Sequence, residues 1–220
     1  MKYIKTFLMA LLAVGAAASF AYAFFLRDPE LRIYRFGQAI DNSIVDAELL
    51  LGIGREDFLN LLQRDVGDLI RIGADYEPAL NIDRELGHFR ESLGHLRDYV
   101  QEAVPLMEAV HNDADFGALR QRAQRLRRHR ELADIFIGQQ ESRVLLLGSL
   151  NVAMVELYGL LSDFEGMFYE TDPWVTLPYV QAVIQQFERI EGIHREYMEA
   201  VEAYARTKAR FYLAIRGERS

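Results

Sequence analysis

The chain contains no cysteine among its 220 residues. This absence excludes disulfide bonds, thiolate metal sites, cysteine nucleophiles and lipidation of a cysteine side chain. Lysine is also scarce beyond the N-terminus, because Lys208 is the only one that follows Lys5. Arginine supplies the positive charge instead, with 22 residues, which genomic base composition explains more simply than function does. A domain without disulfides depends on its hydrophobic core, and a chain of this length can bury an ample one.

Sequence motifs of the common enzyme classes are missing as well. The chain has no glycine-rich phosphate loop, no G-x-S-x-G nucleophile elbow and no H-E-x-x-H zinc motif. No catalytic residue can therefore be assigned, and the sequence predicts a protein that is not an enzyme.

One uncharged apolar run, Thr6 to Leu26, opens the chain. As a helix it is long enough to cross a hydrocarbon core of roughly 30 Å. Lys2 and Lys5 precede the run, and the positive-inside rule then places the N-terminus in the cytoplasm. We expect residues 1–27 to be a single-pass anchor in the inner (cytoplasmic) membrane. Residues 28–220 would then form one exported domain in the periplasm or outside the cell.

The same run also has the features of a cleaved secretory signal. Ala21-Tyr22-Ala23 has the A-x-A pattern of a cleavage site, and cleavage would release the domain into the periplasm. Phe24, Phe25 and Leu26 extend the apolar segment beyond that site, however, and a cleaved signal does not need them. The sequence therefore favours a retained anchor, with a signal peptide as the alternative.

The exported part of the chain is strongly acidic. Residues 28–220 carry 22 basic and 33 acidic side chains, a net charge of −11. A domain with that balance does not favour nucleic acid as its partner. The expected partners are the membrane, through Thr6 to Leu26, and either another envelope protein or a second copy of this chain.

Apolar residues recur at helical spacing through most of residues 28–220, and no segment alternates convincingly with a period of two. The sequence predicts an all-α fold in which an elongated antiparallel four-helix bundle follows the N-terminal segment. The first two helices are expected at 29–73 and 79–110. The third follows a loop at 111–117 and ends near residue 168, and the fourth covers 177–215.

Several residues mark expected ends or breaks of these helices. Pro105 should kink or end the second helix, since proline lacks the backbone donor. Asn112 or Asp113 is available to cap the third helix, and Gly138 or Gly148 could break it. The apolar stripe of the fourth helix is expected to contain Val183, Phe187, Ile190, His194, Met198, Val201, Ala205 and Tyr212.

A dense cluster of arginines stands at the start of the expected third helix. The members of this arginine cluster are Arg120, Arg122, Arg125, Arg127, Arg128 and Arg130. Cations in the first turns of a helix are destabilised by its macrodipole, so nearby negative charge must offset them. One interpretation is an anion site that binds phospholipid headgroups close to the membrane. The other is a solvated face whose arginines pair with glutamates on neighbouring helices.

The segment Val144 to Leu161 is apolar on nearly every side of its expected helix. One face contains Leu146, Leu147, Leu150, Met154, Leu157 and Leu161. The candidate residues for a partner interface, which lie well away from that face, are Leu145, Val152 and Val155. A helix with two apolar faces is central in its fold, meets another subunit, or crosses the membrane a second time. Asn151 and Glu156 argue against the second span.

Two Glu-x-x-His motifs suggest a metal site, one with Glu85 and His88 and the other with Glu191 and His194. Ferritin-like di-iron bundles combine such a motif on two helices with a glutamate from each of the others. The helical phases argue against this site, because His88 falls roughly 120° from the centre of its stripe. No metal or cofactor is assigned, and Glu191 with His194 remains the candidate half-site.

Three polar residues also fall on helical faces that should be buried. They are Asp65, Gln139 and Arg143. A buried Asp–Arg pair among them could fix the register of the bundle. Alternatively, the helical faces rotate at these positions and leave the side chains exposed.

These patterns predict a non-enzymatic, membrane-anchored envelope protein that acts as a scaffold, adaptor or accessory subunit through its helical faces. The alternative is a bundle that binds a metal or a ligand. Its site would use Glu191 and His194 as di-iron ligands, or His194, Tyr197 and Tyr204 around a small molecule.

Overall fold

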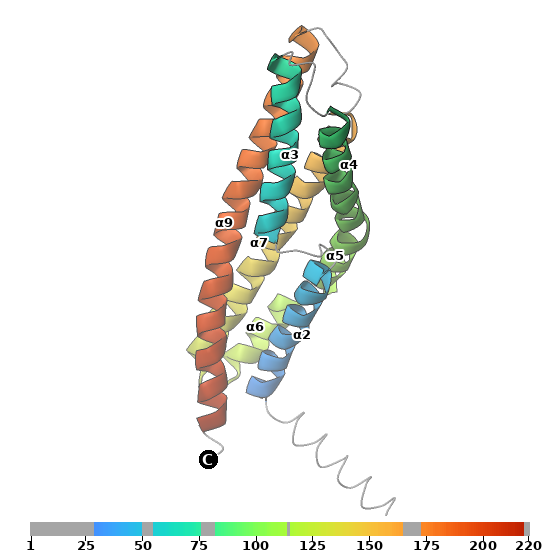
Figure 1. Ribbon diagram of the computed structural model, residues 1–220. Coiled ribbons are helices and arrows are strands. Elements are labelled where there is room, and N and C mark those ends of the chain that lie inside the picture. The colour runs from blue at the N-terminus through green and yellow to red at the C-terminus, as the bar shows by residue number, and fades with distance from the viewer. Residues whose placement is uncertain (1–28, 50–54, 76–81, 114, 165–172, 218–220) are drawn as a thin grey trace, which may run out of the picture. The chain divides into compact units, whose positions relative to one another are not determined.

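A computed structural model of the chain describes residues 29–49, 55–75, 82–113, 115–164 and 173–217, and these residues contain helices and no strand (Figure 1). The predicted all-α class is therefore confirmed. The elements are α2 (Pro29–Leu49), α3 (Arg55–Asp75), α4 (Ile82–Asp98), the π-helical turn η1 (Tyr99–Ala103), α5 (Val104–Asp113), α6 (Phe116–Gln124), α7 (Arg130–Ser162) and α9 (Pro173–Gly217). The predicted membrane segment, Thr6 to Leu26, lies outside the described residues.

The described residues form six helices when α4, η1 and α5 are counted as one continuous helix. The first predicted helix corresponds to α2 and α3, and the residues between them, 50–54, lie outside the described part. The second corresponds to α4, η1 and α5, and the fourth to α9. Helix α9 begins at Pro173, before the predicted start at 177, and contains Pro178 in its interior.

Pro105 does not end the second helix. It lies inside the helix that continues from α4 through η1 into α5, and the π turn η1 lies immediately before it. The backbone N–H of Val104 bonds to the carbonyl oxygen of Tyr99, five residues earlier. This wider turn is a common way for a helix to absorb a local defect without stopping.

The predicted third helix is divided into α6 and α7, which the connection from Arg125 to His129 separates. Charge gives the physical reason. Arg122 now lies in the last turn of α6, where a cation stabilises the helix dipole, and Glu131 lies in the first turn of α7. The backbone of His129 adopts a φ of 52°, in the left-handed region that follows many helix breaks.

The predicted break points and cap of this region are wrong. Gly138 and Gly148 both lie inside α7, because an interior glycine costs a helix only about 1 kcal/mol and the buried stripe of α7 continues through both. Helix α5 continues to Asp113, so the predicted cap is helical. Asp115 is the residue that caps α6, and its Oδ1 accepts a hydrogen bond of 2.7 Å from the N–H of Ala118.

The chain forms two compact units, and α2, α7 and α9 contribute residues to both. Unit 1 contains the start of α2, all of α6, the first part of α7 to Gln140, and α9 from Tyr204 onward. Its core is aromatic. The ring of Phe136 lies 5.3 Å from that of Tyr204 and 5.2 Å from that of Phe211, measured between centroids. Pairs of this spacing stabilise beyond the area that they bury.

A glycine lets α2 approach this aromatic core closely. A Cβ atom on Gly37 would lie 2.5 Å from the Cζ of Phe136 and 3.0 Å from the hydroxyl of Tyr204. Gly37→Ala should therefore destabilise unit 1 by about 1–3 kcal/mol through overpacking. Gly138→Ala is the matched control, since a Cβ there meets nothing within 4 Å, and it should stabilise the helix by about 0.5–1 kcal/mol. Denaturant unfolding followed by circular dichroism measures both, and an unchanged stability of Gly37→Ala would contradict the packing described.

Unit 2 contains residues 40–114 and 141–203. Helix α3 packs against α4, and both bury regular apolar stripes together with α7 and α9. The stripes include Phe58, Leu62, Leu69, Leu86, Phe89, Leu96, Leu150, Met154, Leu157, Leu161, Val183, Phe187 and Ile190. Apolar burial at this density accounts for most of the stability of a helical unit.

Polar side chains also join the helices inside unit 2. Of the two outcomes that the sequence left open, Asp65 and Arg143 are buried and Gln139 is half-buried, but Asp65 and Arg143 do not pair with each other. Asp65 accepts a hydrogen bond of 2.6 Å from the hydroxyl of Ser92, whereas Arg143 pairs with Asp41 on α2. The helical period places each of these two residues on the buried face of its own helix. It does not show which polar residue of another helix lies opposite.

The apolar stripe of α9 was predicted correctly only in its first half. Val183, Phe187 and Ile190 are buried, but Met198 and Tyr212 are exposed. The buried residues farther along are Tyr197, Tyr204, Thr207, Phe211 and Ile215. The buried face keeps a seven-residue repeat from Ile190 onward, and the predicted stripe drifted away from that repeat by one position.

Candidate functional site

Helix α7 presents apolar side chains on two faces, and only one of them belongs to the core. Of the six residues predicted on one face, Leu146 is half-buried and the other five are buried, namely Leu147, Leu150, Met154, Leu157 and Leu161. The three candidate interface residues remain exposed: Leu145 to 52%, Val152 to 51% and Val155 to 40%. Single exposed apolar residues are ordinary, but three on one helix within three turns form a patch that marks interaction sites.

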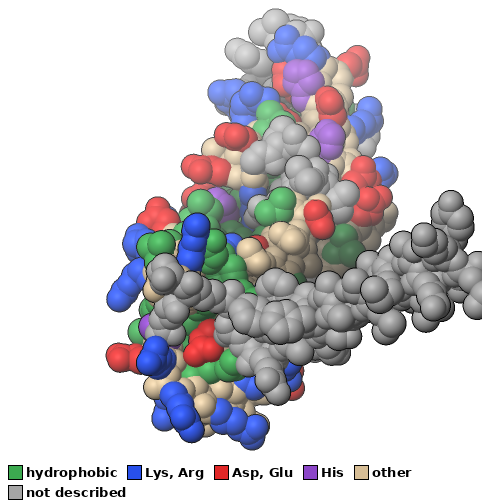
Figure 2. All heavy atoms as spheres, turned by 90° about the horizontal axis from the view of Figure 1, so that it is seen from below, with side chains coloured by type: hydrophobic (Ala, Val, Ile, Leu, Met, Phe, Trp, Pro, Cys, Tyr) green, Lys and Arg blue, Asp and Glu red, His purple; other side chains and the backbone are tan. Residues whose placement is uncertain are grey.

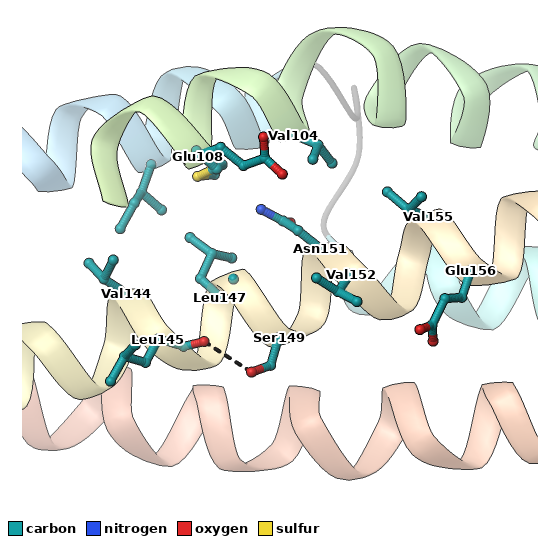
Figure 3. A pocket seen from close by; sticks show the side chains of 13 residues that line it. Val104, Glu108, Val144, Leu145, Leu147, Ser149, Asn151, Val152, Val155 and Glu156 are labelled. Carbon is teal, nitrogen blue, oxygen red and sulfur yellow. Dashed lines mark hydrogen bonds between the residues drawn. The ribbon is translucent and has the colours of Figure 1, made fainter. Parts of the chain in front are cut away.

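These side chains border a groove, called here the α7 groove, with a cavity volume of about 710 Å³. Figure 3 shows its lining, in which Val155 points from α7 toward the side where Val104 and Glu108 lie on α5, and Val152 lies on the near side of α7. The complete lining is Ile44, Val104, Met107, Glu108, Val144, Leu145, Leu147, Gly148, Ser149, Asn151, Val152, Val155 and Glu156. Most of these residues are apolar and a few are polar, the composition that is typical of binding sites.

The polar group that faces the groove most directly is the amide of Asn151. Its side chain is 3% exposed, and the oxygen Oδ1 accepts a hydrogen bond of 2.6 Å from the hydroxyl of Tyr99. The nitrogen Nδ2 has no hydrogen-bond partner among the described residues. Figure 3 shows that this nitrogen ends a side chain which points from α7 toward α5. Leaving such a buried donor unpaired costs about 1–3 kcal/mol.

A buried arginine fixes the orientation of this amide. The guanidinium of Arg55 donates to the hydroxyl of Tyr99 over 3.4 Å, and it lies 5.5 Å from the ring centroid of Tyr197. Because the Tyr99 oxygen accepts that hydrogen bond, its own O–H donates to Oδ1 of Asn151. Nδ2 is therefore the atom of this amide that is left without a partner among the described residues.

Two carboxylates lie at the border of the α7 groove, those of Glu108 and Glu156. Glu156 pairs with Arg189 and accepts a hydrogen bond of 3.1 Å from Gln186, whose Nε2 also bonds to the carbonyl oxygen of Ala153. These contacts hold α7 and α9 together within unit 2. Glu108 is exposed on α5 and adds negative charge at the opposite border.

The arginine cluster lies in unit 1 and is divided among three segments. Arg120 and Arg122 are on α6, Arg130 begins α7, and the other three are in or next to the connection between these helices. All six side chains are exposed. An ion pair of 4.0 Å joins Arg130 to Asp134. The predicted location in the first turns of one helix is wrong, for the electrostatic reason given above.

The Glu-x-x-His motifs are not brought together as a metal centre. Glu85 accepts a hydrogen bond of 2.6 Å from Arg84, which lowers its pKa below the usual value, and it also faces His88 at 3.6 Å. Glu191 is exposed and His194 is half-buried. Among the described residues, no group of three histidine, aspartate or glutamate side chains could hold a metal ion.

The predicted small-molecule pocket around His194 does not agree with where its tyrosines lie. Tyr197 is buried in unit 2 beside Arg55, and Tyr204 is buried in the aromatic core of unit 1. Each ring is therefore used in packing within its own unit.

Helix α7 is also, within the described residues, the helix whose length and composition would let it cross a membrane. About 44% of its most apolar stretch is buried inside the protein. A buried core helix meets the same criteria, and the five buried residues of its core face need no lipid to explain them.

The geometry defines an all-helical protein with an apolar groove on one of its longest helices. No family model, no curated protein and no solved structure matches this chain.

The sequence predicted Leu145, Val152 and Val155 as surface candidates, but it missed the polar part of the site. Asn151 was noted only as an argument against a membrane span, and Tyr99 and Arg55 were not singled out. The available signal was one amide in the middle of a long apolar run, since such a residue needs partners wherever it is buried. Helical spacing alone could not show that those partners come from α3 and η1.

Proposed function

We propose that this protein is a non-enzymatic, membrane-anchored scaffold or adaptor that binds a partner protein in the α7 groove. The observation that carries the proposal is the second apolar face of α7, on which Leu145, Val152 and Val155 remain exposed beside a largely apolar cavity. Exposed patches of this kind mark protein interfaces more often than they serve the fold of a single chain.

The occupant that fits the groove best is an amphipathic helix of another protein. Leu145 and Val155 are ten positions apart on α7, which corresponds to about 15 Å or three helical turns. A helix of that length can place apolar residues against Val152 and its neighbours. Helix-in-groove recognition therefore covers the exposed apolar face of α7.

Charge favours a basic partner over a second copy of this chain. The segments of unit 2, residues 40–114 and 141–203, contain 9 basic and 27 acidic side chains, a net charge of −18. Two such units would repel each other, while basic residues next to an apolar stripe would complement Glu108. The proposed partner is thus an apolar helix with flanking lysine or arginine.

The anchor is the second part of the proposal. Its support is the uncharged run from Thr6 to Leu26, with Lys2 and Lys5 before it, which indicates a single span in the inner membrane with the N-terminus in the cytoplasm. The elongated, antiparallel four-helix arrangement expected from the helix lengths remains a prediction as well. An adaptor tethered in this way would hold its partner at the membrane.

Substitution in the groove tests the proposal. Tagged full-length protein is extracted from its native membrane in a mild detergent, and the co-purified proteins are quantified by mass spectrometry. We expect a stoichiometric partner with the wild type and at least a roughly tenfold loss with Val152→Asp, because a charge in an apolar interface is costly.

Ile184→Asp is the matched control. Ile184 is 47% exposed on α9 of unit 2 and does not line the groove. Both variants should change stability by no more than about 0.5 kcal/mol, as surface substitutions do. Equal loss from both variants, or a partner that Val152→Asp retains in full, would refute the groove as the binding site.

A further inference from the structure

The two units of the chain differ sharply in charge. In unit 1, the described residues 29–39, 115–140 and 204–217 contain 12 basic and 4 acidic side chains, a net charge of +8. The strongly acidic balance of the exported chain therefore belongs to unit 2 alone. A compact unit with this excess of arginine attracts polyanions and anionic surfaces.

The structure holds the basic side chains of unit 1 in solvent. Leu126 is buried in the connection between α6 and α7, and it fixes that segment so that Arg125 and Arg127 on either side are exposed. Neither arginine, nor Arg122, forms an ion pair within the described part of the chain. Their charge is thus available to an external anion rather than used in the fold.

Exposed apolar side chains also lie beside arginines at the end of α9. Leu213 is 65% exposed and Tyr212 is 41% exposed, and Arg210 and Arg216 are near them in sequence on the same helix. Figure 2 shows exposed basic side chains and exposed apolar ones on the face that it draws. Tyrosine, leucine and arginine together are the composition of surfaces that sit at a membrane interface.

Unit 1 also has a cavity at this place, called here the α9 notch. It has a volume of about 440 Å³ and is lined by Leu31, Tyr34, Tyr212, Ile215 and Arg216. The rings of Tyr34 and Tyr212 lie 5.3 Å apart, so the first turns of α2 and the last turns of α9 form its walls. An apolar wall with one guanidinium suits a phosphate that is attached to a lipid.

The position of the notch in the chain supports a lipid as its ligand. Pro29 begins α2 three residues after Leu26, the last residue of the apolar run, and Leu31 lines the notch. Three residues span at most about 11 Å. If the run crosses the membrane, unit 1 therefore begins at the headgroup level. This argument depends on the anchor of the proposed function, but not on the α7 groove.

The geometry points to unit 1 as a binding platform for anionic phospholipid. The headgroup phosphate is held in the α9 notch by Arg216, and the arginine cluster supplies the surrounding positive charge. This inference extends the headgroup interpretation of the arginine cluster to residues on α2 and α9, and it gives unit 1 a role that is separate from partner binding.

Lipid retention by the full-length protein in a neutral detergent tests the inference. The probes are fluorescent phosphatidylglycerol and phosphatidylcholine, and the bound lipid per chain is measured after gel filtration. The wild type should retain phosphatidylglycerol and little phosphatidylcholine. Reversal of three unit 1 charges, Arg122→Glu with Arg125→Glu and Arg127→Glu, should reduce retention roughly a hundredfold at low salt.

A matched triple variant makes the same change of net charge in unit 2. Its substitutions are Arg84→Glu, Arg97→Glu and Arg195→Glu, all at exposed positions. This variant should retain phosphatidylglycerol within about threefold of the wild type, because its charges lie outside the platform. Equal loss from both triple variants, equal retention by both, or equal binding of the two lipids would overturn the inference.

The notch itself is tested by a second pair of variants. Arg216→Ala should weaken phosphatidylglycerol binding about fivefold or more. The control is Arg210→Ala, which removes an exposed arginine of the same helix that does not line the notch. This control variant should weaken phosphatidylglycerol binding less than Arg216→Ala does. Equal effects would overturn the assignment of the headgroup to the notch. Displacement of the lipid by millimolar inorganic phosphate would show that the site takes free phosphate, and displacement by a single-stranded oligonucleotide would show that it takes nucleic acid. Either result would overturn the lipid inference.

Because partner binding and lipid binding have separate readouts, the two proposals fail separately. Val152→Asp should leave lipid retention unchanged, and the unit 1 triple variant should still co-purify the partner. Carbonate extraction of membranes tests the anchor independently of both.

Discussion

Arg143→Ala should lower the free energy of unfolding of unit 2 by about 3–5 kcal/mol, because it removes one partner of a buried ion pair. The side chain of Arg143 is 8% exposed and that of Asp41 is 16% exposed, and the two pair across α7 and α2. Truncation leaves the carboxylate of Asp41 poorly solvated, and the cost of that charge exceeds the value of the contact. Denaturant unfolding monitored by circular dichroism measures the loss.

The control for this prediction replaces both partners. Asp41→Leu combined with Arg143→Met keeps the volume and removes both charges, so its stability should be close to that of the wild type or higher. If Arg143→Ala lost less than about 1 kcal/mol, the pair would behave like an exposed salt bridge, and its burial in unit 2 would be contradicted.

Phe136→Ala should destabilise unit 1 by about 3–5 kcal/mol, the usual cost of removing a buried aromatic ring. Phe136 is 1% exposed and its ring packs against those of Tyr34, Tyr204 and Phe211. The loss includes the transfer of the ring to water and the cavity that remains among rigid neighbours. Thermal and denaturant unfolding of the full chain measure the effect.

The neighbouring residue gives a matched control. Ile135 precedes Phe136 on α7 but is exposed, so Ile135→Ala should change stability by no more than about 0.5 kcal/mol. Equal effects of the two substitutions would mean that α7 presents a different face to the core of unit 1.

Helical spacing predicted much of the fold correctly. It predicted the all-α class and most of the core face of α7, because each depends on the 3.6-residue period alone. It failed where charge or a small defect decided the backbone. The arginine cluster divides α6 from α7 at Arg125 to His129, and a π turn absorbs Pro105 instead of a helix end.

The candidate sites show the same limit. Leu145, Val152 and Val155 could be predicted as a second face, because phase separates them from the core of α7. The orientation of the Asn151 amide could not be predicted, because it depends on Tyr99 and Arg55, far away in sequence. The charge difference between the units was equally hidden, because unit 1 is assembled from three separate parts of the chain.

The central claim is that the α7 groove binds another protein at the membrane. Its most direct test is a photo-crosslinking amino acid placed at position 152 of the full-length protein in its native membrane, with position 184 as the control. We expect position 152 to crosslink to one protein, at a segment with an apolar helical stripe and flanking basic residues, and position 184 to give no such product. Crosslinks at both positions alike, or at position 152 only to lipid or to a second copy of this chain, would contradict the claim.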